Sequence, residues 1–406
     1  MKIGCLPFCP SVILALAFLS CTGGSGPMPP RLQASAPAPG PEGIRFSFSS
    51  ATRGLAASET PYVVFTARDA SGGFCRLDPS GAFIPCSTAD NVIPRNGLNW
   101  CDYAVPMNRL GHLDLPSGFR LDSARIYFSV GSPLYLRVDE KTNGLVQPDP
   151  ANPADPNAGI RYDWVELALD GTGFHGNTTS VDQYGLSVAL SVVDRSDPDH
   201  PLGPVGITES RSALFEAWRA EVPPAFAGLA DTANLRILAP AHATFQDTGS
   251  HGGYLREYID QMWARYRTEP LVLTPDEGTF TGRVDGQDRI VFTREGDPAT
   301  YVIAGKPTTQ EAFLGNGVLA QGNGLERVLG AQIAALLNRH LLEKPGAWRD
   351  VSAYYRQAPY NYYASFWHRH SLGGKAYGFA YDDVNGQSSS LAARDPQEVR
   401  ISLRWD

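Results

Sequence analysis

Hydrophobic and polar residues alternate along the first half of the chain in the way that predicts β-strands. Residues 44–48 (IRFSF) alternate with a period of two, and residues 62–66 (YVVFT) form a short β-branched and aromatic run. The same criteria predict further strands at 125–130, 134–138, 162–169 and 186–193. This half of the chain is therefore expected to be mainly β-sheet.

The pattern changes to helical spacing in the middle of the chain. Residues 254–266 place apolar side chains on one helical face, at Leu255, Ile259, Met262, Trp263 and Tyr266. Other helices are predicted at 210–220 and 326–342, short strands at 271–273, 278–284 and 289–293, and a last strand at 398–405. We therefore expect a mainly β fold with an α/β part, divided into a β domain (42–205 plus about 375–406) and a mixed α/β domain (about 206–374).

Residues 1–21 have the pattern of an export signal. Lys2 supplies a positive charge, and residues 12–19 (VILALAFL) form an apolar core that is too short to span a bilayer. A small residue precedes Cys21, as in lipoprotein signals, where the Cys thiol is lipidated. Residues 22–41 are rich in Gly, Ser, Ala and Pro, which predicts a disordered tether. We expect an extracellular or cell-envelope protein, either lipid-anchored at Cys21 or cleaved and freely secreted.

Net charge, cysteines and histidines bear on which ligands and cross-links the chain is expected to have. The net charge is −8, so the chain has no basic excess for nucleic-acid binding. In an oxidising compartment one disulfide is expected among Cys75, Cys86 and Cys101, with the pairing left open. His368 and His370 have no third ligand at a recognisable spacing, so no metal or other cofactor is expected.

Two acidic residues near the middle of the β region are candidates for catalysis. Glu166 lies in a predicted strand where Trp164 shares its face, while Val165 and the next alternate residues are aliphatic and take the core face. If residues 171–176 turn the chain, the next segment runs antiparallel and brings Asp182 across one groove from Glu166. Glycoside hydrolysis uses such a carboxylate pair. The residues alone leave open a second interpretation, a solvated strand carboxylate and a turn residue.

Two long segments around these residues carry a family resemblance. Residues 162–185 (YDWVELALDGTGFHGNTTSVDQYG) and 361–389 (NYYASFWHRHSLGGKAYGFAYDDVNGQSS) resemble glycoside hydrolase family 64. These are β-1,3-glucanases of the thaumatin-like superfamily, including the laminaripentaose-producing type, and the resemblance covers roughly residues 41–406. It implies a thaumatin-like β-barrel or sandwich domain plus a mixed α/β domain that together form a wide groove. It also implies endo-type hydrolysis of β-1,3-glucan with inversion, releasing short laminari-oligosaccharides.

The resemblance also implies roles for individual residues. The family's catalytic Glu is followed sixteen positions later by an Asp, which here are Glu166 as general acid and Asp182 as general base. Two positions depart from the family, with Ala168 in place of a polar residue and His175 in place of an aromatic one, and these changes concern substrate-length preference. The sugar contacts expected around the pair are Trp164, Asp170, His175, Asn177, Thr178, Thr179, Tyr184, Trp367, Tyr377, Asp382 and Asp383.

The expected partner is β-1,3-glucan, such as curdlan or laminarin, bound by a monomer. A second hypothesis is a non-catalytic β-1,3-glucan-binding protein on the same scaffold. A third is a surface protein that uses the groove for a protein partner. The presence of both Glu166 and Asp182 favours the enzyme, since loss of either acid would have favoured the binding protein.

Overall fold

The computed structural model describes residues 43–51, 59–69 and 71–404. These residues belong to one compact unit, Pro39–Asp406. The predicted signal, the tether and Cys21 lie outside the described residues. None of the helices in the described part of the chain is long and apolar enough to cross a membrane.

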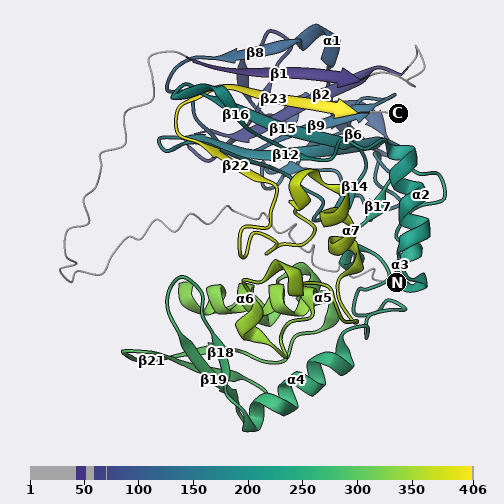
Figure 1. The fold of residues 1–406 in the computed structure, drawn as a ribbon. Coiled ribbons are helices and arrows are strands. Elements are labelled where there is room, and N and C mark those ends of the chain that lie inside the picture. Colours follow the sequence, from purple (N-terminus) through teal and green to yellow (C-terminus); the bar gives the residue numbers. More distant parts are fainter. Residues whose placement is uncertain (1–42, 52–58, 70, 405–406) are drawn as a thin grey trace. The chain divides into compact units, whose positions relative to one another are not determined.

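Two open β-sheets pack face to face in the β region (Figure 1). The first has the order β16-β15-β23-β1-β8 and the second β22-β13-β12-β9-β2-β3-β4, with β7 also paired to β2. The strands of the first sheet are β1 (Ile44–Ala51), β8 (His112–Leu115), β15 (Ser187–Asp194), β16 (Asp197–Gly206) and β23 (Pro396–Arg404). Those of the second are β2 (Pro61–Arg68), β3 (Phe74–Leu77), β4 (Phe83–Pro85), β7 (Val105–Pro106), β9 (Leu121–Val130), β12 (Arg161–Asp170), β13 (Gly173–Thr178) and β22 (Ser390–Ala393).

One hydrophobic cluster fills the space between these sheets. Phe46 of β1 contacts Phe65 of β2 with ring centroids 5.6 Å apart, and Phe48 lies 6.2 Å from Phe128 of β9. All four rings belong to this core, Phe48 at its edge, although β2 and β9 are buried at consecutive positions and do not alternate in burial. The expected closed barrel is wrong, because the described sheets keep distinct edge strands. Edge strand β16 contains three prolines, at 198, 201 and 204, which cannot donate to a neighbouring strand.

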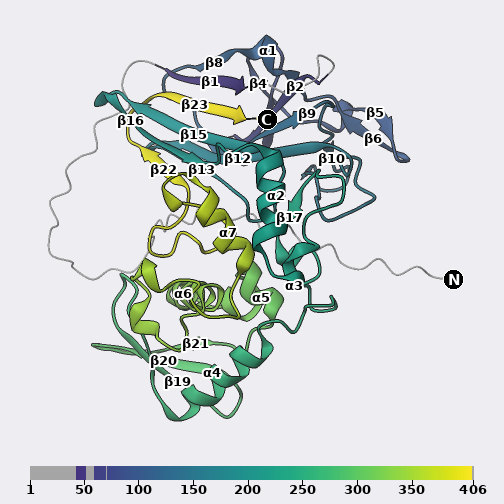
Figure 2. The same ribbon diagram turned by 45° about the vertical axis from the view of Figure 1, so that its right-hand side comes forward.

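The last strand returns to the first sheet. In Figures 1 and 2, β23 (yellow) lies next to β1 (purple), and its backbone pairs with β1 in parallel and with β15 in antiparallel register. The sequence predicted a terminal strand at 398–405, and β23 confirms it. Short two-stranded pairs border the sheets and are formed by β5 (Asn91–Arg95) with β6 (Leu98–Cys101), β10 (Arg137–Val138) with β11 (Leu145–Val146), and β14 (Gln183–Tyr184) with β17 (Ile237–Leu238).

Helices and a small sheet form the segment between β16 and β22. The helices are α2 (Arg211–Glu221), α3 (Pro224–Ala227), α4 (Arg256–Thr268), α5 (Thr309–Leu314), α6 (Gly324–Arg339) and α7 (Tyr362–His370), and a short helix α1 (Met107–Leu110) lies earlier in the chain. The four-stranded sheet contains β18 (Leu271–Leu273), β19 (Phe280–Val284), β20 (Ile290–Arg294) and β21 (Asp297–Ile303) in sequential order. The three predicted helices and three predicted strands of this segment are confirmed, while α7 and β21 were not predicted.

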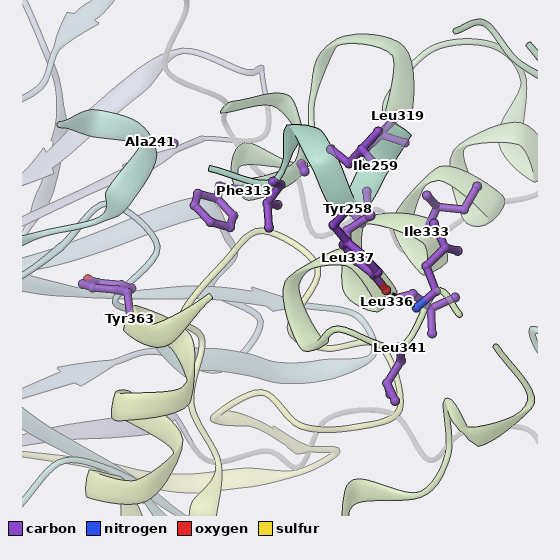
Figure 3. Packing of buried hydrophobic residues seen from close by; sticks show 14 of the residues in the cluster. Ala241, Tyr258, Ile259, Phe313, Leu319, Ile333, Leu336, Leu337, Leu341 and Tyr363 are labelled. Atoms are coloured by element: carbon purple, nitrogen blue, oxygen red, sulfur yellow. Dashed lines mark hydrogen bonds between the residues drawn. The ribbon is translucent and has the colours of Figure 1, made fainter. Parts of the chain in front are cut away.

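Helix α6 is the centre of the second large core (Figure 3). It begins at Asn323, whose side chain accepts hydrogen bonds from the amides of residues 325 and 326, which are otherwise unpaired at a helix start. Its apolar residues, including Ile333 and Leu337, pack against Ile259 of α4 and Phe313 of α5. The helical spacing at 254–266 and 326–342 therefore reports a real buried face.

The three described cysteines are free thiols, so the expected disulfide is wrong for this structure. The Sγ of Cys75 donates to the carbonyl of Ala67 at 3.5 Å, and that of Cys101 to Oδ1 of Asn91 at 3.1 Å. Burial raises the pKa of Cys86 to about 12, which keeps it protonated. All three thiols are buried inside the β region, where they behave as small apolar groups.

Candidate active site

A row of polar residues crosses the second sheet on the face opposite the sandwich core. Cross-strand pairing aligns Thr66 of β2 with Arg125 of β9, Arg125 with Glu166 of β12, Glu166 with Asn177 of β13, and Asn177 with Ser390 of β22. The residues on either side of Glu166 in β12, Val165 and Leu167, lie in the sandwich core. The predicted facing of this strand is therefore confirmed, and Glu166 points away from the core.

Glu166 is paired with an arginine that the sequence analysis missed. Nη2 of Arg125 lies 2.8 Å from Oε1 of Glu166, and the Glu166 side chain keeps 21% of its surface exposed. The other guanidinium nitrogen of Arg125 donates to Oε1 of Gln147, which also accepts from the Tyr127 hydroxyl at 2.9 Å. The Arg125 guanidinium is thus held in place on a well-packed strand beside the carboxylate.

Asp182 lies after the end of β13, in the connection to β14. The hairpin of β12 and β13 is antiparallel, as predicted, but β13 ends at Thr178, so Asn177 and not Asp182 is the direct neighbour of Glu166. The Asp182 side chain is 33% exposed, and its Oδ1 lies 2.9 Å from Nε2 of His242. Arg125 forms an ion pair with Glu166, and the charge of Asp182 also acts on it.

His242 and Arg125 stabilise the ionised form of Asp182. Burial alone would raise the pKa of this carboxyl, but contact with His242 and the charge of Arg125 outweigh burial and hold the pKa below its usual value. The same contact raises the pKa of His242, again against the effect of burial. Asp182 is therefore ionised at neutral pH, as a general base must be.

The backbone that carries Asp182 is held on both sides. The Ser180 amide donates to the carbonyl of Tyr377 at 2.9 Å, and the Tyr363 hydroxyl donates to the Ser180 carbonyl at 2.6 Å. On the other side, the Gly185 amide donates to the buried carboxyl of Asp163 at 2.8 Å. Burial raises the pKa of Asp163 to about 7. Because Asp163 is on β12 with Glu166, these bonds fix the Asp182 segment relative to the strand that carries Glu166.

A small pocket adjoins this segment. Its lining includes five of the predicted sugar contacts, Trp164, Thr178, Thr179, Tyr184 and Tyr377, together with further residues of the same region, namely Asp163, Ser180, Leu186, Val188, Ile207, Ser371, Ala376 and Ser389. Thr178 and Thr179 follow directly on Asn177, so these three polar side chains lie between the two carboxylates along the chain. The structure thus gathers the predicted NTT segment with Glu166 and Asp182.

Three aromatic residues predicted to stack on sugar are buried in this structure, and their contact with sugar stays a prediction. Trp367 is 0% and Tyr184 1% exposed, and their rings pack together at 4.5 Å in the core around α7. Trp164 is 4% exposed and its ring lies 5.4 Å from the Arg125 guanidinium. The physical reason is tertiary packing, since neighbouring rings and strands cover the ring faces of all three side chains.

Asp382 has a structural environment, which contradicts its predicted contact with sugar. It is 0% exposed, and its carboxylate lies 3.1 Å from Nη2 of Arg339 and 3.0 Å from Nε2 of His368. Its neighbour Asp383 is exposed in the turn that follows. Tyr377 is also buried, and its hydroxyl donates to the Ala380 carbonyl at 3.2 Å.

Asp170 and His175 lie at the far end of the β12–β13 hairpin. Asp170 accepts from the amide and hydroxyl of Thr172, each at 2.6 Å, and His175 contacts the same hydroxyl at 2.8 Å. Asp170 is four residues from Glu166, a distance of roughly 13 Å along a strand. His175 pairs with Ala168, two residues from Glu166 on the same face of β12, so of the two residues Asp170 is the one far from Glu166. The predicted sugar contacts of both stay predictions.

The two histidines of α7 face different partners. His368 contacts Asp382, while His370 contacts Glu209 and Glu221 at 2.9 and 3.3 Å. Within the described ranges, no group of three or more His, Cys, Asp or Glu side chains is arranged to hold a metal ion.

Two of the residues missed at the site differ in how visible they were in the sequence. Arg125 could have been found, because alternation along 125–130 places it on the outer face, opposite Glu166 once the register is known. His242 had no such signal. It ends a 3₁₀ turn, Pro240–His242, and meets Asp182 only through the tertiary fold.

Glu166 and Asp182 are both partly exposed, and the first lies on the polar face of a β-sheet, which makes them the candidate pair of this site. The chain belongs to the β-1,3-glucanase family, glycoside hydrolase family 64, whose profile matches residues 51–403. A glucan endo-1,3-beta-glucosidase of Cellulosimicrobium cellulans is 32% identical over 296 residues, which are 69% of this chain and 52% of that protein. The chain thus spans about half the length of the curated relatives it matches.

Solved structures of the same family share the fold. A β-1,3-glucanase domain from Clostridium beijerinckii has a TM-score of 0.83 and 33% identity, covering 91% of this chain and 100% of that one. A laminaripentaose-producing β-1,3-glucanase from Paenibacillus barengoltzii, solved with laminarihexaose, has a TM-score of 0.71 and 30% identity, covering 92% of this chain and 77% of that one. Mainly β-sheet architecture with helices is therefore shared with known members.

Proposed function

We propose that this protein hydrolyses β-1,3-glucan internally, with inversion at the anomeric carbon, and releases short laminari-oligosaccharides. The observation that carries the proposal is the placement of Glu166 and Asp182 around Arg125, with both carboxylates reachable from solvent. Family membership supports the substrate, since the solved relative from Paenibacillus barengoltzii was captured with laminarihexaose.

Asp182 is the general base in this proposal. Its carboxylate is ionised, and the contact with His242 uses one oxygen, which leaves the other for a water molecule. Removal of a proton from that water makes it the nucleophile at the anomeric carbon. Inversion requires room for this water, so the two carboxyl groups of the working enzyme should be about 6.5–9.5 Å apart.

Glu166 is the general acid. It donates a proton to the glycosidic oxygen of the leaving sugar, and Arg125 at 2.8 Å then stabilises the carboxylate that remains. As the acid, Glu166 has to regain a proton after each turnover, and its partial exposure gives solvent access to the carboxylate.

In this proposal the polar residues between the two carboxylates offer the small part of their surface that stays exposed, 3% for Asn177, 9% for Thr178 and 7% for Thr179, to sugar hydroxyls. Asn177 lies beside Glu166 in the sheet, and Thr178 and Thr179 lead toward Asp182. Amide and hydroxyl groups at this position can both donate and accept, as neutral sugars require.

Incubation of the protein with curdlan and laminarin tests this proposal. We expect reducing ends to appear and short oligosaccharides to accumulate from both glucans. Binding to insoluble curdlan without any release of reducing sugar would instead favour the second candidate, a non-catalytic glucan-binding protein. That candidate is kept because a carboxylate pair with polar neighbours can also bind a sugar chain.

The proposed location is outside the cell or at the cell envelope, with lipid attached at Cys21. The support is the signal pattern of residues 1–21 in the sequence alone. We expect the full chain to incorporate labelled palmitate and the Cys21→Ala variant to incorporate none. Unlabelled protein that is released freely into the medium would refute the lipid anchor and would mean that the chain is cleaved and secreted.

A further inference from the structure

The segment 239–242 binds both the backbone and the side chain of the proposed base. The Ala239 amide donates to the Asp182 carbonyl at 2.9 Å, and the His242 imidazole reaches Oδ1 of Asp182, also at 2.9 Å. These contacts come from a part of the chain about sixty residues away, next to β17, which itself pairs with β14. The base is thus clamped by a short segment whose own position is fixed by strand pairing.

The Nε2 atom of His242 forms an ion pair with Asp182, while the His242 side chain as a whole is 30% exposed. Nε2 of His242 is buried, and apart from the Asp182 ion pair it has no hydrogen-bond partner in the described part of the chain. A buried ring nitrogen of this kind is costly unless it is paired. The ion pair with Asp182 therefore offsets the cost of burying Nε2.

Titratable groups from other parts of the chain surround Asp182 and His242. The charge of Asp182 acts on Arg125 and Tyr127 of β9 and on Tyr363 of α7, and Asp149, after β11, acts on His242. Glu166 of β12 acts through Arg125. Among these groups Arg125 is the one other cation, and it is already paired with Glu166. Within this set, His242 is the basic group in direct contact with Asp182.

We infer that His242 is a positioning residue of the hydrolytic site: as an imidazolium it holds one oxygen of Asp182, keeps this carboxylate ionised and leaves its second oxygen to the attacking water. The inference rests on the proposed function, in which Asp182 is the base. His242 touches neither substrate nor water in this account and acts only through Asp182.

The inference predicts a shift in pH dependence when the imidazole is replaced. In His242→Gln, burial still raises the pKa of Asp182 and only Arg125 opposes it, so Asp182 takes up a proton at higher pH than in the wild type. The base works only when ionised, so the acid limb of the kcat/KM profile moves up by about one pH unit or more. At a pH on that limb, activity falls roughly tenfold.

A matched surface pair provides the control. His200 lies 2.8 Å from Asp197, but both side chains are exposed and lie outside the proposed site. His200→Gln should leave the profile unchanged. A His242→Gln enzyme with lower melting temperature or lower kcat but an unmoved acid limb would overturn the inference, because a purely structural histidine has that effect.

A second measurement tests the ion pair of His242 and Asp182 without requiring enzyme turnover. Proton–carbon NMR of the imidazoles, assigned with the His242→Gln spectrum, gives the pKa of His242 in the wild type and in Asp182→Asn. We expect a value above the ordinary one that falls by about one unit in Asp182→Asn. Equal values in the two proteins would overturn the inference. A wild type that releases no sugar at any pH would instead refute the proposed function, and the NMR titration would still decide the pair.

Discussion

Glu166→Gln and Asp182→Asn are each expected to lower kcat/KM on laminarin by roughly 10²–10⁴-fold, the usual contribution of a general acid or base. Both substitutions keep the size of the side chain and remove the proton-transferring group. Binding of the variants to curdlan should remain, because hydroxyl and amide contacts along residues 177–179 are unaffected. Initial rates of reducing-sugar release and pull-down on curdlan measure the two effects.

The leaving group separates the two roles. A laminari-oligoside with a dinitrophenyl leaving group needs no proton from an acid, so Glu166→Gln should recover much of its rate on this substrate. Asp182→Asn should not recover, because the attacking water still has to lose a proton. The reverse pattern would mean that the two roles are exchanged.

The first sheet offers a matched control for Glu166. Glu398 is a strand glutamate, 23% exposed, whose carboxylate lies 2.8 Å from Arg400. It thus has the exposure and the arginine partner of Glu166, but it lies outside the proposed site. Glu398→Gln should keep near-normal turnover, and a Glu166→Gln enzyme equally active would remove Glu166 from the mechanism.

Asp382→Asn is expected to destabilise the fold by about 3–5 kcal/mol, as when one partner of a buried ion pair is removed. Arg339 is 2% exposed and would lose its only carboxylate partner among the described residues, while His368 would lose the same contact. The folded fraction should retain its kcat and its affinity for glucan. Chemical denaturation and kinetics below the transition measure stability and activity separately.

Lowering the pH should reduce the contribution of the Asp382 carboxylate to the free energy of unfolding. Burial raises the pKa of Asp382, but the charges of His368 and Arg339 outweigh it and hold the pKa below its usual value. A carboxyl with a lowered folded pKa stabilises the protein above its unfolded pKa, and this stabilisation is lost as the pH falls through the folded value. Asp276, 90% exposed beside Arg349, is the surface control, and Asp276→Asn should change little. Lower glucan affinity with unchanged stability in Asp382→Asn would restore its role in sugar binding.

Local pattern predicted the elements that position the site. Alternation along β12 placed Val165 in the core and Glu166 on the outer face, and the turn before β13 produced the expected hairpin. These features depend on neighbours in sequence, which the pattern contains. The same holds for α4 and α6, whose apolar spacing matches their buried faces.

The environment of each side chain depended on contacts that no local pattern contains. Trp367 belongs to a recognisable motif, yet its ring is enclosed because α7, which was not predicted, packs against α2. His242 reaches Asp182 across about sixty residues. The sequence therefore proposed the carboxylate pair and contained a signal for Arg125, whereas the contact of His242 with Asp182 required the fold.

The anomer released first from laminarin tests the central claim most directly. Proton NMR during the first minutes of reaction, before mutarotation, distinguishes α from β reducing ends. An acid and a base acting on opposite faces of the sugar predict the α-anomer from a β-1,3-glucan. A β-anomer would require a covalent intermediate and would contradict the roles assigned to Glu166 and Asp182.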